Sequence, residues 1–208
     1  MTTLPARRQG HGIKLSFYDF GATPFFACQY DQRFSYCLYV PADYDETAAK
    51  AYDLAVIVHG TGRTATQYRD LFADFAQRHD CIVLAPLFPV GIIEPGDLAN
   101  YKRIQFHDIR YDHVLLAMVD EVIAKYRVNG CRFLLYGYSG GGQFCQRFFM
   151  LHPERLQAVS IGAPGVVTLL HPDYDWWVGV RDVPARFGKA IDIDAMRQVA
   201  VQLSLIHI

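Results

Sequence analysis

Four short runs of mostly apolar residues recur along the chain, and segments with helical spacing lie between them. The runs are Leu54 to Val58, Cys81 to Ala85, Phe133 to Tyr136 and Leu156 to Ile161. Strands covered on both faces have this character, because neither set of side chains meets water. The pattern therefore predicts a parallel sheet whose strands are connected by helices.

The first two connections each predict one amphipathic helix. The first opens with the capping-box pattern Thr64-Ala65-Thr66-Gln67 and carries an apolar face at Tyr68, Leu71, Phe72, Phe75 and Ala76. The second has apolar residues three and four apart, at Val114, Leu115, Met118, Val119, Val122, Ile123 and Tyr126. Its predicted polar face is formed by Asp112, Asp120, Glu121 and Lys125. We expect it to end near Asn129-Gly130, where glycine supplies a C-cap.

The third predicted helix begins at or just after Ser139 and ends before Pro153, because the residue preceding proline disfavours helical backbone. Its buried side chains are Phe144, Cys145, Phe148 and Phe149. Alternating strands and helices indicate an α/β fold with a mostly parallel, doubly wound sheet.

The flanking segments differ from this repeating pattern. Residues 13–40 are rich in aromatic and β-branched residues and predict an antiparallel hairpin at the sheet edge. Residues 163–195 lack periodicity and form either a cap over a site, which we favour, or a long connection. Another strand begins at Gln198, and residues 1–202 are expected to form a single domain.

The last six residues, 203–208, read Leu-Ser-Leu-Ile-His-Ile. This is the translation of CTG TCT CTT ATA CAC ATC, the transposon-end adapter of sequencing libraries. We therefore expect 203–208 to be a non-native tail on a C-terminally truncated chain, and we exclude His207 as a catalytic base. The alternative is a genuine apolar strand end.

Composition narrows the range of partners. The 208-residue chain has a formal net charge of −1, with no basic patch for nucleic acid or an anionic membrane, so a small molecule is the expected partner. The N-terminal segment Met1 to Gly10 has no apolar stretch behind its arginines, and no segment has membrane-spanning length, which indicates a cytoplasmic protein. Five cysteines without a Cys-x-x-Cys pair indicate reduced core thiols, with no metal site and no cofactor.

The residues Gly137-Tyr138-Ser139-Gly140-Gly141 match Gly-x-Ser-x-Gly and fall between a predicted strand and a predicted helix. At such a turn the serine backbone is strained, and its neighbours two residues away must lack side chains. The hydroxyl of Ser139 would then project above the sheet, near the positive end of the following helix. The alternative is a plain glycine-rich turn or a phosphate-binding loop, although a dinucleotide fingerprint would follow the first strand.

The residues His59-Gly60-Thr61-Gly62 follow directly on the first apolar run. Backbone N–H groups of Thr61 and Gly140 could together bind an alkoxide that forms when Ser139 attacks a carbonyl. Gly60 and Gly62 would let the backbone approach closely. His59 is expected to hold this loop; the alternative is a general base.

These motifs resemble the α/β-hydrolase superfamily, in particular esterases similar to polyhydroxybutyrate depolymerases and feruloyl esterases. The resemblance spans about Phe34 to Gly165 and includes the run Tyr39-Val40-Pro41-Ala42-Asp43-Tyr44. It implies hydrolysis of a small-molecule ester through an acyl-enzyme, with Ser139 as nucleophile, a histidine as base and a carboxylate orienting that histidine.

The resemblance also implies the chain order Ser, then acid, then His, with the acid after the strand that begins at Gln198. Neither residue exists at the implied positions, so we expect this fragment to be inactive and its full-length parent to be active. Asp173 or Asp175 with His171 could substitute, but such a loop is more typical of a solvated turn. Three further histidines precede or flank the wrong elements: His107; His113, which we expect at the surface; and His152, which we expect only to end a helix.

Two other functions remain open: a peptidase similar to prolyl oligopeptidases, and a hydrolase-fold binding protein without a triad. Nothing in the sequence determines the oligomeric state. Four aromatic residues could line a substrate pocket or belong to the core, and we favour the core: Tyr138, Phe144, Trp176 and Trp177.

Overall fold

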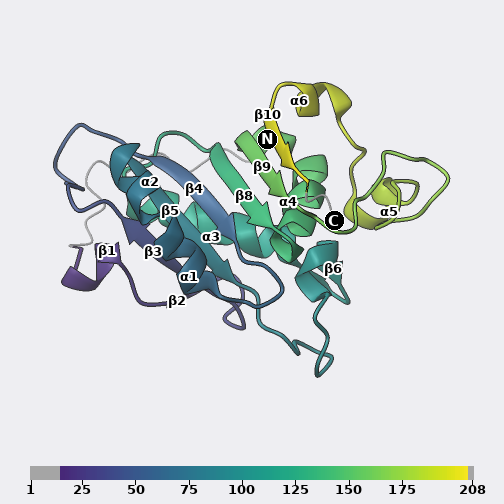
Figure 1. The fold of residues 1–208 in the computed structure, drawn as a ribbon, viewed down its shortest axis with the longest axis horizontal. Coiled ribbons are helices and arrows are strands. Elements are labelled where there is room, and N and C mark those ends of the chain that lie inside the picture. The colour runs from purple at the N-terminus through teal and green to yellow at the C-terminus, as the bar shows by residue number, and fades with distance from the viewer. Residues whose placement is uncertain (1–14, 206–208) are drawn as a thin grey trace.

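The protein is described by a computed structural model covering residues 15–205, and a mixed sheet forms its centre (Figure 1). The sheet order is β1-β3-β5-β4-β8-β9-β10, with β2 also paired to β3. The strands are β1 (Gly21–Ala22), β2 (Phe26–Ala27), β3 (Ser35–Val40), β4 (Asp53–Val58), β5 (Cys81–Leu87), β8 (Phe133–Tyr138), β9 (Leu156–Gly162) and β10 (Ala200–Ser204).

The directions of the strands confirm the predicted fold class. Strands β5, β4, β8, β9 and β10 run parallel, and β3 is antiparallel to β5. Both β1 and β2 pair antiparallel with β3, which confirms the N-terminal antiparallel element; residues 13 and 14 of its predicted range lie outside the described residues. Strand β10 includes Leu203 and Ser204. The described residues do not include the N-terminal segment Met1 to Gly10 or residues 206–208, and so not His207.

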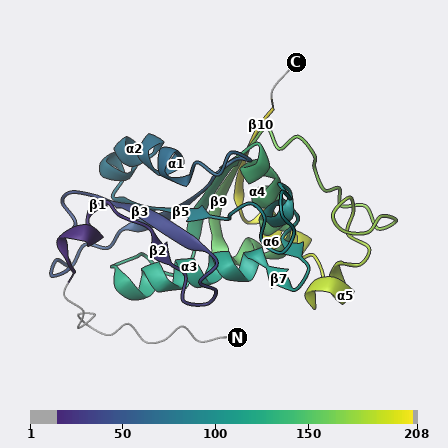
Figure 2. The same ribbon diagram turned by 90° about the horizontal axis from the view of Figure 1, so that it is seen from below.

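Helices connect these strands on both faces of the sheet. The α-helices are α1 (Ala65–Leu71), α2 (Ala73–Arg78), α3 (Tyr111–Lys125), α4 (Gly140–Leu151), α5 (Val183–Phe187) and α6 (Ile193–Arg197). Short 3₁₀ turns are η1 (Phe17–Asp19), η2 (Asn100–Arg103) and η3 (Pro153–Arg155), and a small ribbon joins β6 (Gln105–Phe106) to β7 (Ile109–Arg110). Figure 2 shows α1 and α2 on one face and α3 on the other.

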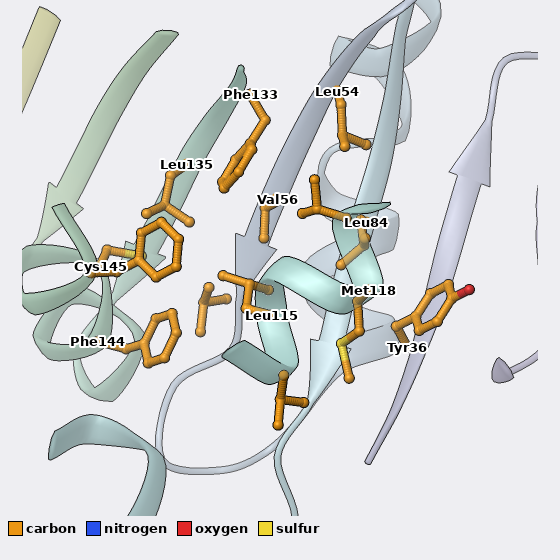
Figure 3. Close-up of a cluster of buried hydrophobic side chains, with 14 of the residues drawn as sticks. Tyr36, Leu54, Val56, Leu84, Leu115, Met118, Phe133, Leu135, Phe144 and Cys145 are labelled. Carbon is orange, nitrogen blue, oxygen red and sulfur yellow. The ribbon is translucent and has the colours of Figure 1, made fainter. Parts of the chain in front are cut away.

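Alternation along the central strands divides the core between the two faces. Leu54 and Val56 of β4 belong to the large cluster with α3 and α4, whereas Ala55 and Ile57 belong to the smaller cluster under α1 and α2. Figure 3 shows the large cluster, in which Leu115 lies between Phe144 and Cys145 on one side and Met118 on the other. Helix α4 buries Phe144, Cys145, Phe148 and Phe149, as predicted.

The first helical connection differs from its prediction in two ways. The helix breaks at Phe72, whose φ of −99° and ψ of 5° separate α1 from α2. This break shifts the helical phase, and Leu71 is 78% exposed rather than facing the sheet. The predicted capping box is also wrong, because the Thr64 side chain makes no capping hydrogen bond.

Helix α3 ends at Lys125, before the predicted stop at Asn129-Gly130. Tyr126 is already extended, and its buried hydroxyl donates to the Asp19 carbonyl oxygen over 2.8 Å, which draws the chain out of the helix. The first turn of α3 also differs from its prediction. Asp112 was expected on the polar face, but its side chain is fully buried.

Residues 163–195 contain α5 and the start of α6, and they project from one end of the sheet (Figure 1). All five cysteines are free, and four of them are buried. No helix among residues 15–205 combines the length and the apolar character that crossing a bilayer requires.

Candidate functional site

Ser139 lies in the one-residue turn between β8 and α4. Its backbone has φ 55° and ψ −117°, a region that side chains rarely adopt, and its N–H donates to the Gly162 carbonyl oxygen over 2.9 Å. Its side chain is partly exposed. The turn therefore holds a strained and partly exposed serine at the carboxyl end of a central strand.

Glycines make this turn possible. A Cβ at Gly137 would lie 2.3 Å from the Gly141 carbonyl oxygen, and a Cβ at Gly141 would lie 2.3 Å from the Val58 carbonyl oxygen. Gly142, which sequence reasoning missed, is equally constrained, since its Cβ would lie 2.5 Å from the Gly162 carbonyl oxygen. The run of three glycines from 140 to 142 could have indicated this constraint from the sequence.

The loop after β4 lies against this turn. A Cβ at Gly60 would lie 3.9 Å from the Ser139 Cβ, and a Cβ at Gly140 would lie 2.9 Å from Thr61 Oγ1. Gly140 opens α4, where the first amides have no carbonyl partner within the helix. The structure thus brings Ser139, Thr61 and Gly140 together. A Cβ at Gly62 would meet only the Thr64 methyl, at 3.9 Å.

His59 is fully buried beneath this loop, and both ring nitrogens have backbone partners. Nδ1–H donates to the Gly60 carbonyl oxygen over 2.8 Å, and Nε2 accepts from the Phe88 N–H over 3.0 Å. Burial lowers the pKa of His59 to about 4, so the ring is neutral at pH 7. This arrangement fits a residue that holds the loop, since no ring nitrogen is free to take a proton from Ser139.

Three further residues fix the same loop and were missed from sequence. The Tyr101 hydroxyl donates to the His59 carbonyl oxygen over 3.0 Å, and the Arg63 guanidinium donates to the Thr61 carbonyl oxygen over 2.6 Å. The Tyr68 hydroxyl would lie 3.1 Å from a Cβ at Gly60. Tyr101 lies in a segment without periodicity, so no local pattern marks it.

The other described histidines lie away from Ser139. His152 does more than end a helix, because its Nε2 lies 2.8 Å from Asp112 Oδ2. This pair lies at the C-terminal end of α4, and Ser139 precedes the N-terminal end, about 18 Å away along the helix axis. His171 is partly exposed and lies near Asp173, while Asp175 pairs with Arg181. His107 pairs with Glu94, and His113 is exposed, as expected. Within residues 15–205, no histidine ring is hydrogen-bonded to Ser139.

The four aromatic residues considered for a pocket divide by burial. Phe144 is fully buried and Trp176 is 8% exposed, which places both in the core. Trp177 is partly buried and packs against the same cluster. Tyr138 is 38% exposed and directly precedes Ser139 in the chain.

No protein-family model and no curated protein sequence matches this chain. Solved structures do match it. Poly(aspartic acid) hydrolase-1 from Sphingomonas sp. KT-1 superposes with a TM-score of 0.70 at 20% identity, covering 88% of this chain and 70% of its own. The poly(3-hydroxybutyrate) depolymerase from Bordetella parapertussis gives 0.65 at 22% identity, covering 82% of this chain and 58% of its own.

A third match covers most of both chains. The fluorophosphonate-binding serine hydrolase F of Staphylococcus aureus superposes with a TM-score of 0.59 at 14% identity, over 88% of this chain and 89% of its own. At such identities the likeness establishes the fold, and the chemistry must be argued from the residues of the site.

Proposed function

Because this chain has the α/β-hydrolase fold, we propose that it belongs to a carboxylic-ester hydrolase that works through an acyl-enzyme on Ser139. The observation that carries the proposal is the position of Ser139, at positive φ between β8 and α4, with the loop of Gly60 and Thr61 packed against it. A nucleophile held at a turn beside two free backbone donors is what acyl transfer requires.

The reaction proceeds in two halves. Ser139 Oγ attacks the ester carbonyl carbon while a base takes its proton, and the carbonyl oxygen becomes an alkoxide bound by the N–H groups of Thr61 and Gly140. The tetrahedral adduct expels the alcohol, which takes up that proton, and leaves an acyl-serine. Water then attacks the acyl group by the same route and releases the acid. Losing one alkoxide donor typically costs about 100- to 1000-fold in rate.

In this proposal, the base and the acid that orients it belong to residues of the parent protein beyond position 202, where the expected non-native tail begins. This assignment is supported by one observation: within residues 15–205, no histidine ring is hydrogen-bonded to Ser139. The acid would follow β10, whose carboxyl end lies on the same side of the sheet as that of β9. The 208-residue chain alone is then weakly active or inactive.

The proposed substrate is a small-molecule carboxylic ester, handled in the cytoplasm without a cofactor. Support for ester chemistry comes from the motif together with the matched structures, among which are a polyester depolymerase and a thermostable esterase. Five cysteines without a disulfide support the cytoplasmic location.

A fluorophosphonate probe tests the proposal on the protein expressed from its completed coding sequence. Labelling is expected at Ser139 and should disappear in Ser139→Ala. The matched control is Ser160→Ala, because Ser160 lies on β9 with its hydroxyl bonded to Gln202, and this variant should label fully. A completed, folded protein that never labels would refute the proposal and favour a binding protein. Preference for aminoacyl amides over short-chain esters would favour a peptidase.

A further inference from the structure

Lys102 and three arginines form a group of cationic side chains without a carboxylate partner. They are Arg63, Lys102, Arg103 and Arg147, and none of them forms an ion pair within residues 15–205. Three of the four have compensation of another kind. Arg63 donates to backbone carbonyls and stacks on Tyr101, while Arg103 and Arg147 both lie over the Trp177 ring. Lys102 has neither type of partner.

Lys102 reaches the turn that carries the nucleophile. A Cβ at Gly140 would lie 2.9 Å from Lys102 Cε, the same distance as from Thr61 Oγ1. The last methylene of the lysine therefore packs against the residue that follows Ser139, beside both proposed alkoxide donors. Since Nζ is one bond beyond Cε, the ammonium stands at the edge of the site.

The backbone behind Lys102 is held in place. The fully buried guanidinium of Arg147 donates to the Lys102 carbonyl oxygen and, over 2.8 Å, to Thr168 Oγ1. The N–H of Lys102 donates to the Ala99 carbonyl oxygen over 3.1 Å within η2. A lysine anchored in this way loses less conformational freedom on binding a ligand than a free surface lysine does.

The electrostatic surroundings leave this ammonium under-compensated. Burial lowers the pKa of Lys102, and the nearby charges of Arg63, Arg103 and Arg147 lower it further, against the opposing effect of Asp97. Asp97 caps the Ala99 N–H over 3.2 Å and forms no ion pair with the lysine. A half-buried cation among other cations gains more from an added anion than one that is already paired.

We propose that the Lys102 ammonium binds a carboxylate of the substrate, so that this hydrolase acts on esters that also carry a free carboxylate. Lys102 is then a specificity-determining residue. That the bound carboxylate belongs to a substrate rests on the proposed ester hydrolysis. The carboxylate-binding site itself is argued from the geometry around Gly140.

Binding is tested first on the completed protein carrying Ser139→Ala, so that no probe is hydrolysed. Reductive methylation with ¹³C gives dimethyl-lysine signals, and Lys102→Arg assigns the relevant one. The probes are adipic acid monomethyl ester and dimethyl adipate. The monoester should shift the Lys102 signal saturably and raise its pKa, and the diester should do neither. An unmoved signal, or an equal effect of the diester, would overturn the proposal.

Specificity is tested on the completed protein with 4-nitrophenyl hydrogen adipate and its methyl ester. Lys102→Met keeps the aliphatic packing on Gly140 and should lower the ratio of kcat/KM, anionic over neutral ester, by about 10- to 100-fold, as expected for a hydrogen bond to a charged group. Lys102→Arg should restore part of the ratio.

Lys50→Met is the matched control, because Lys50 is paired with Asp43 and Asp80 elsewhere on the surface, and the ratio should not change. An equal loss on both esters would instead assign Lys102 to alkoxide stabilisation and overturn the proposal. Carboxylate binding without Ser139 labelling would leave this site standing while the proposed esterase fails, so the two failures are distinguishable.

Discussion

His152 Nε2 lies 2.8 Å from Asp112 Oδ2, and both side chains are buried at the end of α4 remote from Ser139. Arg110 donates to both oxygens of the same carboxylate, over 2.9 and 2.6 Å. The Lys189 ammonium donates to His152 Nδ1 over 3.1 Å. This network joins the start of α3, the end of α4 and the chain after α5, so its role is to hold these three segments together.

Asp112→Asn should destabilise the protein by about 3 kcal/mol at pH 7, because it leaves buried donors and the Arg110 charge without their carboxylate. Urea unfolding measures the effect. The control is Asp120→Asn on the same helix, since Asp120 is half-exposed and its pair with Arg155 should contribute at most about 1 kcal/mol. Equal costs at the two positions would show that burial of the network does not matter.

The cost of Asp112→Asn should also depend on pH. Burial opposes ionisation of Asp112, but hydrogen bonds from His152 and Arg110 outweigh it and hold the pKa well below its ordinary value of 3.8. The stabilisation is therefore complete at neutral pH and is lost as the pH falls through about 4 and below. The difference between wild type and variant should shrink from pH 7 to pH 3.

Replacing either of two buried tyrosines by phenylalanine should have opposite effects on stability. The Tyr101 hydroxyl donates to the His59 carbonyl oxygen, whereas the equally buried Tyr111 hydroxyl has no hydrogen-bond partner among the described residues. Tyr101→Phe should therefore cost about 1 kcal/mol and slow probe labelling of Ser139, while Tyr111→Phe should be neutral or stabilising. Thermal unfolding of both variants checks the signs. A larger loss at Tyr111 would contradict the assignment.

Adding one methyl group at Gly137 should disrupt the turn. Its Cβ would lie 2.3 Å from the Gly141 carbonyl oxygen, a backbone atom, and 2.6 Å from Sγ of the fully buried Cys145. Gly137→Ala should cost about 2 kcal/mol or more and abolish labelling of Ser139 in the completed protein. Gly62→Ala, where only the Thr64 methyl lies within 4 Å, should change the free energy of unfolding by less than about 1 kcal/mol.

The buried ring of His59 should make stability pH-dependent above the range in which Asp112 acts. Its pKa of about 4 in the folded protein lies below the ordinary 6.5, so the unfolded chain takes up a proton first as the pH falls. Stabilisation of up to about 3 kcal/mol is complete above pH 6.5 and is lost between 6.5 and about 4. This part of the slope should be missing in His59→Gln, and ¹⁵N NMR should find the wild-type ring in its Nδ1–H form at pH 6.

The strands and the nucleophile turn could be predicted because their signals are local. An uninterrupted apolar run such as Leu54 to Val58 indicates a doubly covered strand by itself, and the glycines around Ser139 are required by the turn they form. The end of α3 was wrong for the opposite reason. That helix ends where Tyr126 donates a hydrogen bond to Asp19, 107 positions earlier in the chain. The spacing of apolar residues within the helix cannot indicate such a distant contact.

Long-range contacts also account for what was missed around the site. Tyr101 and Lys102 reach Gly140 across about forty positions of sequence, from a 3₁₀ turn that has no periodicity. Asp112 lies at a polar position of an amphipathic helix, and it is buried only because His152 and Arg110 cover it. A polar residue on a helix surface can therefore belong to a buried network that only the fold assembles.

The exposed edge of the sheet predicts association of the 208-residue chain. Within the described residues β10 pairs only with β9, and its Val201 and Leu203 side chains are 52% and 57% exposed. Val201 also lines an apolar groove that runs over β8 and β9 beside Phe72 and Phe75 of the first helical connection. An open strand edge next to an apolar face is a template for pairing with another chain.

We therefore expect the chain to aggregate or fold poorly, and the double substitution of Val201 and Leu203 by lysine to reduce the aggregated fraction severalfold in size-exclusion chromatography with light scattering. Val178→Lys changes an exposed apolar residue outside the sheet, 45% exposed, and should leave aggregation unaltered. The two sets of variants separate the edge from general surface hydrophobicity, because they add the same kind of charge at different places. A monodisperse wild-type chain that melts cooperatively would show that the open edge is no liability.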